Sequence, residues 1–463
     1  MVTILTVLSK YVIIIMGAIY TLSCFTLFRP SNADRQKILL SRQLKKLFIF
    51  HFFCYLVLYL QMEEINVLWF YGAQTIFIII VQILYGKLYP SGSRLITNNM
   101  CFLLILGFTI LTRLNFDLAV KQYFIVCVCI VAFIVVPYLV GTLKGFGKYY
   151  LFYGATGLVL LSSVFVIGAR KNGAVNWIKL GPLMLQPSEF VKILFIFFVA
   201  SMLAQSDEFR NVVVTTLFAG AHVIILVLEK DLGGALLFFI VYLVMLFVAT
   251  GKKLYFIAGI GAGGLAAFIA YHLFTHVQTR VEAWRDPWSI IDGGGNQIAQ
   301  SLFAIGTGSW LGLGLDEGMP YKIPVVVSDF IFSAIAEELG ALFALCLLLI
   351  CVSCFVSFVD IAMQNRIMVY KLLALGFGVC YIFQVFLSVG GVTKFIPSTG
   401  VTLPLVSYGG SSVASSILVF NIIQGLYIKA HNEDSDNLKI EKQQKSLSHK
   451  KKKENHKVRK QQK

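Results

Sequence analysis

The residues of this chain that could do chemistry are a few charged side chains set in or beside long apolar stretches. Glu189 and Lys192 stand three residues apart in GPLMLQPSEFVK, a spacing that puts both on one side of a helix. Pro187 suits the first helical position, so Glu189 would lie near the positive end of the helix dipole. This pattern fits either a capped helix with a local ion pair or a polar pair lining a substrate groove.

Asp329 stands where a polar loop meets an apolar stretch, in SDFIFSAIAEELG. An ionised side chain at mid-membrane costs about 2.5–3.5 kcal/mol, so such residues usually mark a site or a buried pair. At this boundary the carboxylate is either a helix N-cap or a catalytic group. On a helix, Glu337 would lie about 12 Å further along and Glu338 about 180° around from Asp329.

A second charged boundary is formed by Glu229, Lys230 and Asp231, which precede LGGALL. Charges at the end of a membrane span are common, and the pattern fits a structural helix end as well as a site.

Proline and glycine interrupt the apolar pattern in KFIPSTGVTLPLVSYGGSSVASS. Unwound backbone at membrane depth is tolerated only where it lines a cavity or is buried in protein. A glycine-rich backbone can present N–H donors to an anion. The segment is therefore a candidate binding loop for a polar, phosphate-bearing group, and its candidate ligands are Lys394, Thr399, Ser407, Tyr408 and Ser411.

The long segment 276–328 is rich in Gly, Gln and Trp and adds Arg280, Gln297 and Gln300 to the candidates. Within it, QSLFAIG is typical of a short amphipathic helix lying at the membrane interface. Its tryptophans are expected near headgroup level, where this residue is enriched.

The elements that position these residues must be membrane helices. Of 463 residues, 58% are hydrophobic and 13% are charged, about half the usual charged share of a soluble domain. This excludes a soluble globular protein, a coiled coil and a disordered chain. Apolar runs of about 20 residues are needed to cross the hydrocarbon. We predict an all-α polytopic membrane protein of about thirteen spans, near 4–28, 46–63, 66–88, 98–114, 121–143, 149–168, 187–205, 211–229, 233–250, 253–275, 329–357, 367–390 and 408–429.

Positively charged loops face the cytoplasm, which orients the spans. The segment 29–46 carries six basic residues and is expected inside. Alternation then places the N-terminus outside, and 169–186, 276–328 and 391–407 together on the outer face. The first apolar run is interpreted as a span rather than a signal peptide. The unusual polar residues of the chain thus gather on one side of the membrane.

The nine cysteines all lie in apolar stretches, where free cysteine packs as a small hydrophobe. We expect neither a disulfide framework nor a metal site from them. Residues 431–463 hold eleven basic and five acidic residues. They are expected to form a disordered basic cytoplasmic tail attracted to anionic headgroups, and a nucleic-acid partner is not expected.

Five motifs in order resemble the SEDS family, the FtsW/RodA/SpoVE group. They are NWIKLGPLMLQPSEFVK, EKDLGGALL, DGGGNQIAQSLFAIGTGSWLGLGL, SDFIFSAIAEELG and PSTGVTLPLVSYGGSS. The resemblance covers 98–430, which would be a ten-helix core. It leaves 1–97, with about three extra helices, without a functional interpretation. The chain departs from the family pattern at Lys230, where the family has proline, and in 314–318, which adds two acids.

The resemblance implies a peptidoglycan glycosyltransferase of the cytoplasmic membrane, acting in cell-wall biogenesis, cell shape or cell division. Its substrate would be lipid II, polymerised into an undecaprenyl-diphosphate-linked glycan at the outer face. Carried over by motif, Asp329 is the family's essential acidic residue. A class B penicillin-binding protein is the implied partner. Two alternatives stay open: a flippase for lipid-linked precursors, built like other transporters with broken helices, and a non-enzymatic scaffold for division or shape.

The mechanism that we expect needs a base, because the attacking sugar 4-hydroxyl is a poor nucleophile. Asp329 would take its proton, a contribution of about 10²–10⁴-fold. The leaving diphosphate needs positive charge, for which Lys192, Arg280 and Lys394 are candidates. A divalent cation, Mg²⁺ or Mn²⁺, is left open. The remaining substrate-binding candidates are Trp177, Glu189, Gln297, Gln300, Thr399, Ser407, Tyr408 and Ser411.

Overall fold

The computed structural model describes residues 2–29, 32–143, 145–171, 174–181 and 183–433. In this part of the chain, twelve helical segments are long and apolar enough to cross a membrane. The thirteenth predicted span, 187–205, is a helix of 17 residues, about 26 Å long and slightly shorter than the hydrocarbon core. The all-α polytopic prediction is confirmed, and the count of about thirteen is approximate.

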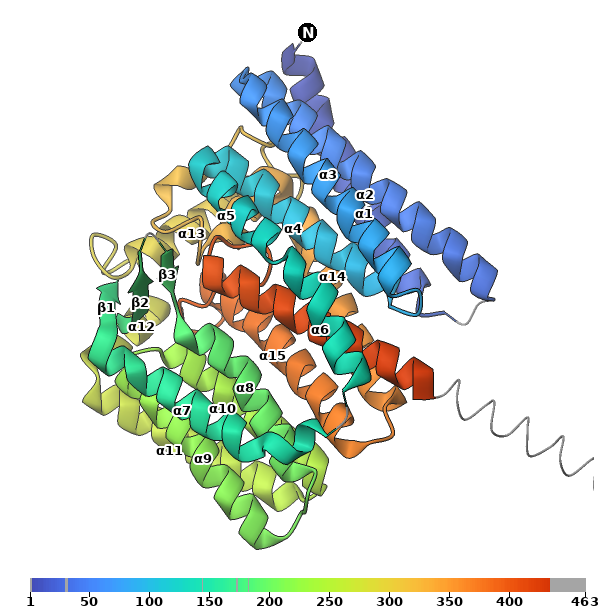
Figure 1. Cartoon of the computed structure of the whole chain (residues 1–463). Coiled ribbons are helices and arrows are strands. Elements are labelled where there is room, and N and C mark those ends of the chain that lie inside the picture. The colour runs from blue at the N-terminus through green and yellow to red at the C-terminus, as the bar shows by residue number, and fades with distance from the viewer. Residues whose placement is uncertain (1, 30–31, 144, 172–173, 182, 434–463) are drawn as a thin grey trace, which may run out of the picture.

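The helices follow one another along the whole described chain (Figure 1). Their bounds are α1 Val2–Thr26, α2 Ala33–Met62, α3 Ile65–Leu88, α4 Arg94–Leu114, α5 Phe116–Val128, α6 Ile130–Thr142, η1 Phe146–Tyr149, α7 Tyr150–Ile167, α8 Pro187–Leu203, α9 Phe209–Leu228, α10 Leu232–Thr250, α11 Lys253–Leu273, α12 Thr275–Arg285, α13 Asn296–Gly308, η2 Pro320–Lys322, α14 Ile331–Gln364 and α15 Met368–Val392. A final helix covers Gly410–Glu433.

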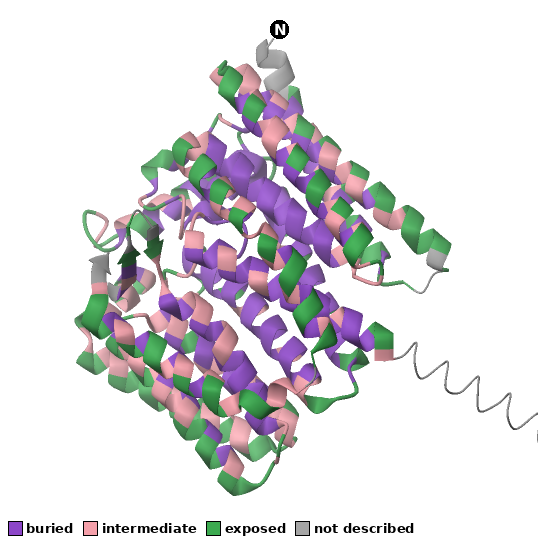
Figure 2. Ribbon diagram, viewed as in Figure 1, coloured by how far each residue is buried: buried purple, intermediate pink, exposed green. Residues whose placement is uncertain are grey.

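Burial divides the bundle into a centre and a periphery. Helices α4, α14, α15 and Gly410–Glu433 run through the middle and carry most of the buried side chains, whereas α11 faces outward along its length (Figure 2). Helices α7 to α11 pack on one side of this centre and α1 to α3 on the other (Figure 1). The two packed sides are therefore held together by these central helices, of which α14, α15 and Gly410–Glu433 begin or end at the predicted outer loops 276–328 and 391–407.

The N-terminal helices are fastened to the centre by buried polar groups. Asn99 of α4 accepts hydrogen bonds from Tyr20 (3.1 Å) and Gln43 (3.3 Å) and donates one to Ser353 of α14 (2.9 Å). Side-chain hydrogen bonds of this kind join helices where no water competes. The predicted span 46–63 is the second half of α2, so most of the basic stretch expected as a loop at 29–46 is helical instead.

A small antiparallel sheet was not predicted. Strands β1 Gly168–Lys171, β2 Ala174–Leu180 and β3 Leu183–Leu185 pair in the order β1-β2-β3. The strands are three to seven residues long, too short for an alternating pattern to stand out between two apolar spans. The sheet lies at the same end of the bundle as α12 and α13 (Figure 1).

Helix α14 is broken at Gly340, where the predicted span 329–357 was expected to be continuous. Gly340 has φ +83°, and a Cβ there would lie 2.4 Å from the backbone nitrogen of Gly312, so only glycine fits. The loop at 309–314 enters the break and satisfies the freed backbone groups, with hydrogen bonds from Leu313 to the Glu337 carbonyl and from Ala341 to the Ser309 carbonyl, among others. Exposed helix ends within a membrane bundle need such partners.

The two additional acids of 314–318 have structural partners. Arg113 of α4 forms an ion pair with Asp316 and donates from Nε to Glu338 at 3.0 Å. Glu317 accepts a hydrogen bond from Gln61 of α2 at 2.7 Å. The two additional acids thus connect the loop at 314–318 to α4 and to α2.

Two other sequence predictions have clear outcomes. The amphipathic segment QSLFAIG forms part of α13, as predicted, and all nine cysteines are free. The basic tail predicted for 431–463 lies, from residue 434 on, outside the described residues.

Candidate functional site

The candidate site is built where the three predicted outer loops, 169–186, 276–328 and 391–407, come together, and Asp329 stands at its centre. Its backbone N–H donates to the Val325 carbonyl at 3.2 Å, which forms a turn that ends two residues before α14 begins. Asp329 therefore lies where the segment 276–328 meets a span, and the outer side of that segment stays a prediction.

The segment before Asp329 is held by the loop at 391–407. Ser407 donates from Oγ to the Ser328 carbonyl (2.5 Å) and accepts from the Leu403 N–H (2.9 Å). The Tyr408 N–H donates to the Val327 carbonyl at 2.8 Å. Ser407 is buried, so its hydroxyl fixes the position of the residue next to Asp329 and faces away from solvent.

Arg280 reaches the same place from α12. Its Nη1 donates to the Thr399 carbonyl at 3.2 Å. The next residue, Gly400, has φ +73°, and a Cβ there would lie 3.6 Å from Asp329 Oδ2 and 3.9 Å from Arg280 Nη2. The carboxylate and the guanidinium therefore face the same small volume beside Gly400.

Arg280 is partly withdrawn from solvent, and this affects its pKa. Burial lowers the pKa of the guanidinium below its ordinary value, and the carboxylates of Asp231 and Asp329 oppose part of that shift. Arginine stays protonated nonetheless. The site consequently holds a fixed positive charge that interacts with two carboxyl groups.

Asp231 was not assigned to the site by sequence, although the charged boundary before LGGALL pointed to it. It caps α10 by accepting from the Gly234 N–H at 2.8 Å, and it accepts from Gln186 (3.2 Å) and Ser188 (3.3 Å) at the start of α8. Burial raises its pKa. Asp231 thus joins the first turns of α8 and α10 beneath the loop that carries Gly400.

The first residue of this boundary, Glu229, is buried, and its Oε1 has no hydrogen-bond partner within the described residues. Burial, followed by the neighbouring Asp231, raises the pKa of Glu229 to about 8. Lys230 between them has φ +66°, a left-handed conformation at the turn between α9 and α10.

Glu189 and Lys192 form an ion pair within α8, as their spacing predicted. Lys192 Nζ lies 2.6 Å from Glu189 Oε2 and donates to Gln384 of α15 at 3.0 Å. Ser415 donates to the same Glu189 oxygen at 2.7 Å. The pair therefore connects α8 with α15 and the final helix inside the bundle.

The other predicted residues lie around this centre. Gln297 is exposed and Gln300 half-buried on α13, and α13 is held to α14 and α15 through its neighbour Ser301. Trp177 pairs with Ala169 in the sheet. The Lys394 carbonyl accepts from Trp284 at 3.2 Å, and Ser411 Oγ accepts from the Gln186 N–H at 3.0 Å. These residues, here called the rim residues, lie on the sheet, on α13 and on the loop and helix start that follow α15.

Metal ligation was left open by the sequence. Within the described residues, no three His, Cys, Asp or Glu side chains are grouped so that they could hold a metal ion.

Residues 94–432 match the model of the FtsW/RodA/SpoVE family, described as cell cycle proteins. The chain is 35% identical over 296 residues to a Mycobacterium tuberculosis protein named peptidoglycan glycosyltransferase RodA. The aligned region covers 58% of this chain and 62% of that protein. It is 35% identical over 328 residues to the Mycobacterium leprae RodA, at 66% and 69% coverage. It is 34% identical to an Aliivibrio salmonicida protein named probable peptidoglycan glycosyltransferase FtsW, at 60% and 70% coverage.

The fold is similar to two solved structures. A chain of a peptidoglycan synthase complex, described as coordinating polymerization and crosslinking, superposes with a TM-score of 0.63 at 24% identity, over 73% of this chain and 98% of that chain. The rod-shape-determining protein RodA of Thermus thermophilus superposes with a TM-score of 0.55, over 73% and 97%. The family resemblance carried by the five motifs is thereby confirmed. The chain is a multi-pass protein of the cytoplasmic membrane, and it belongs to the FtsW/RodA/SpoVE family.

Proposed function

We propose that this chain is a peptidoglycan glycosyltransferase that polymerises lipid II at the outer face of the cytoplasmic membrane. The observation that carries the proposal is the approach of Asp329 and Arg280 to one volume beside Gly400. The names of the relatives support the reaction class. This chain spans 62% of the length of the M. tuberculosis RodA.

In the proposed step, Asp329 accepts the proton of the sugar 4-hydroxyl. The oxygen of that hydroxyl attacks the anomeric carbon of the other sugar. The bond between that carbon and the diphosphate oxygen breaks, and its electron pair leaves with the undecaprenyl diphosphate. A positioned carboxylate base contributes about 10²–10⁴-fold to such a reaction. The turn from Val325 and the Ser407 hydrogen bond to Ser328 hold this base in place.

Arg280 is the residue that we assign to the leaving diphosphate. Its guanidinium is rigid and permanently charged, and planar donors of this kind suit phosphate oxygens. Lys192 is already paired with Glu189 inside the bundle, so we propose that this pair shapes the floor of the site. Lys394, half-buried at the outer loop, is proposed as a second cation for the diphosphate.

The rim residues are proposed to bind the rest of the substrate. Gln297, exposed on α13, and Gln300 next to it offer amide groups to sugar hydroxyls, and Trp177 offers a ring face. Thr399, Tyr408 and Ser411 belong to the loop and helix start that carry Gly400. Together these groups would orient the saccharide against Asp329.

The experiment that tests the assignment compares Asp329→Asn with Asp292→Asn in the purified full chain, using lipid II and gel analysis of glycan strands. Asp292 is an exposed aspartate of the same outer segment. We expect Asp329→Asn to lose at least 100-fold in rate and Asp292→Asn to keep its activity, with both proteins equally stable to heat. Polymerisation by Asp329→Asn at the unmodified rate would refute the base.

We also propose that 98–430 is the catalytic core and that 1–97 is an additional helical module, a division that the matched range 94–432 supports. A class B penicillin-binding protein is the proposed partner, and adding it to the same assay should raise the rate. The flippase alternative predicts transfer of labelled lipid II between leaflets without polymer. The scaffold alternative predicts that Asp329→Asn supports growth.

A further inference from the structure

A cavity lies at the end of the bundle opposite Asp329. Its volume is about 690 Å³, within the roughly 300–1,000 Å³ range typical of ligand pockets. Its walls are η1, the end of α8, the start of α15 and the end of the final helix. Helices α8 and Gly410–Glu433 begin at the outer site, and α15 ends there, so this cavity opens at the cytoplasmic end of all three.

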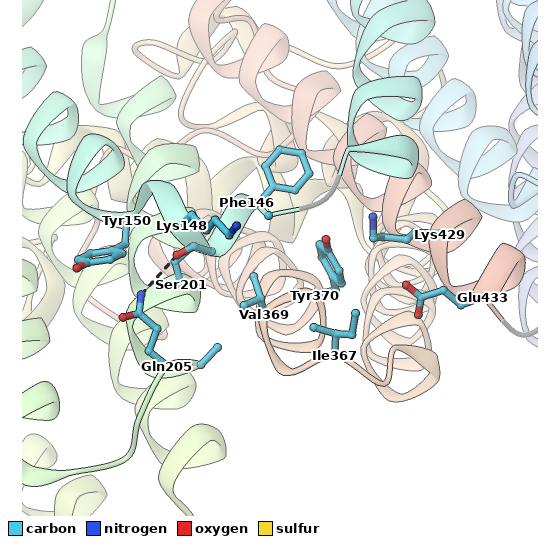
Figure 3. Close-up of a pocket in the computed structure, with 13 residues that line it drawn as sticks. Phe146, Lys148, Tyr150, Ser201, Gln205, Ile367, Val369, Tyr370, Lys429 and Glu433 are labelled. Atoms are coloured by element: carbon cyan, nitrogen blue, oxygen red, sulfur yellow. Dashed lines mark hydrogen bonds between the residues drawn. The ribbon is translucent and has the colours of Figure 1, made fainter.

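The lining combines apolar side chains with two lysines. Phe146, Ile367 and Val369 supply apolar surface, while Lys148 and Lys429 supply positive charge. In Figure 3 the two lysines lie on either side of the Tyr370 ring. A headgroup phosphate would therefore meet positive charge from two sides, next to a surface suited to acyl chains.

Lys429 is held in a fixed position in the wall of this cavity. It is 5% exposed, its Nζ donates to the Leu143 carbonyl at 2.8 Å, and it lies 4.5 Å from the centre of the Tyr370 ring. Lys148 is exposed at the other side of the opening. Glu433 is the acid among the lining residues, so the lining keeps a net positive charge.

We propose that this cavity binds an anionic glycerophospholipid of the cytoplasmic leaflet. The phosphate would lie between Lys148 and Lys429, and the first part of the acyl chains would lie against Phe146 and Val369. Charge complementarity supports this occupant, because basic pockets between helices on the cytoplasmic side bind anionic headgroups and this leaflet is rich in them. The volume holds a headgroup and the start of the chains, whose remainder would extend into the bilayer.

The lipid would reinforce the connection between α6 and α7. The segment 145–150 joins α6 to α7, and one of its tethers is a long hydrogen bond of 3.4 Å from Gln205 to the Gly147 carbonyl (Figure 3). A lipid in contact with this segment, α15 and the final helix would bridge the centre of the bundle and its α7–α11 side.

The test uses the full chain in phosphatidylcholine vesicles with spin-labelled phosphatidylglycerol or spin-labelled phosphatidylcholine. Electron paramagnetic resonance then gives the immobilised fraction of each label. We expect the unmodified chain to prefer phosphatidylglycerol, and Lys148→Gln to weaken that preference about fivefold, the ratio for about 1 kcal/mol per basic residue near an anionic surface. Lys253→Gln, an exposed lysine on the same cytoplasmic side, should leave it unchanged.

A second variant tests the cavity and not the charge. Val369→Trp fills the space with a large side chain and should abolish the immobilised phosphatidylglycerol component in a protein that still unfolds cooperatively. Equal effects of Lys148→Gln and Lys253→Gln, or an unmodified chain without preference for phosphatidylglycerol, would overturn the proposal. If Val369→Trp does not fold, the two lysine variants decide the matter alone, because both side chains are exposed.

Discussion

Replacing Gly400 by alanine separates the geometry of the site from the stability of the fold. Gly400 has φ +73°, and the added methyl would lie 3.6 Å from Asp329 Oδ2 and 3.9 Å from Arg280 Nη2. Both distances are ordinary van der Waals contacts, so the methyl fits without a clash. The left-handed conformation costs an L-residue about 1–2 kcal/mol, which a folded membrane bundle can absorb.

The effect on rate should be much larger than the effect on stability. A sugar hydroxyl must come within about 2.6–3.2 Å of the base to lose its proton, and the methyl would occupy space between the carboxylate and the guanidinium. A displacement of about 1 Å in such an arrangement lowers the rate about 100-fold. Initial rates of glycan-strand synthesis at saturating lipid II, together with thermal unfolding curves, measure the two effects separately.

Gly251→Ala is the matched control. Gly251 ends α10 with φ +66° and nothing lies within 4 Å of its Cβ position, so it carries the same backbone cost far from the site. We expect Gly251→Ala to show a similar loss of stability and a nearly unmodified rate. If the two variants lose the same activity, or if Gly400→Ala polymerises normally, the placement of substrate beside Gly400 is wrong.

Three further predictions follow from other contacts. Arg280→Lys keeps the positive charge but loses the planar guanidinium donors. The kcat/KM for lipid II should fall about tenfold, as for the loss of one charge-assisted hydrogen bond worth about 1.5 kcal/mol. An unmodified kcat/KM would show that Arg280 does not bind the diphosphate. Burial, with Asp231 adding to it, raises the pKa of Glu229 to about 8, so the folded state holds a proton that the unfolded chain releases, and stability should fall as the pH rises from about 5 through 8. Glu229→Gln should flatten this fall in unfolding curves, while the exposed Glu282→Gln should not. In Gly17→Ala the new Cβ would lie 2.6 Å from an aromatic ring of α14, and the free energy of unfolding should fall by about 1–3 kcal/mol. Gly72→Ala, which has nothing within 4 Å of its Cβ position, should change it little in the same unfolding curves. Equal losses would contradict the close approach of α1 to α14.

Sequence reasoning located the membrane spans well because each depends on local composition. The apolar runs and their polar boundaries mark helix ends, and Asp329 and the Glu189–Lys192 pair are local features of this kind. The break at Gly340 was missed because the residues on both sides, Glu337 to Leu339 and Ala341 to Phe343, are mostly good helix formers, so only the entering loop reveals it.

The composition of the site could be predicted only in part, because its residues are far apart in the chain. Arg280 was named as a diphosphate ligand by charge alone, and its neighbours Asp231 and Gly400 are brought to it by the packing of α10 and of the loop at 391–407. A glycine with positive φ has no sequence signature of its own among the glycines of this chain. Ser407 was predicted to contact substrate, and the structure instead shows its hydroxyl bonded to backbone groups.

The broken helix α14 also determines where this protein tolerates inserted residues. Four backbone hydrogen bonds between 309–314 and the residues flanking Gly340 close the gap, about 14 Å from the first residue of the helix. Lengthening that stretch by even one residue would shift their register and leave several groups unpaired, each at a cost of several kcal/mol where water is absent. Epitope tags and fluorophores for following the protein in cells should therefore be inserted at the exposed turn around 291–294, which takes no part in the hydrogen bonds around Gly340.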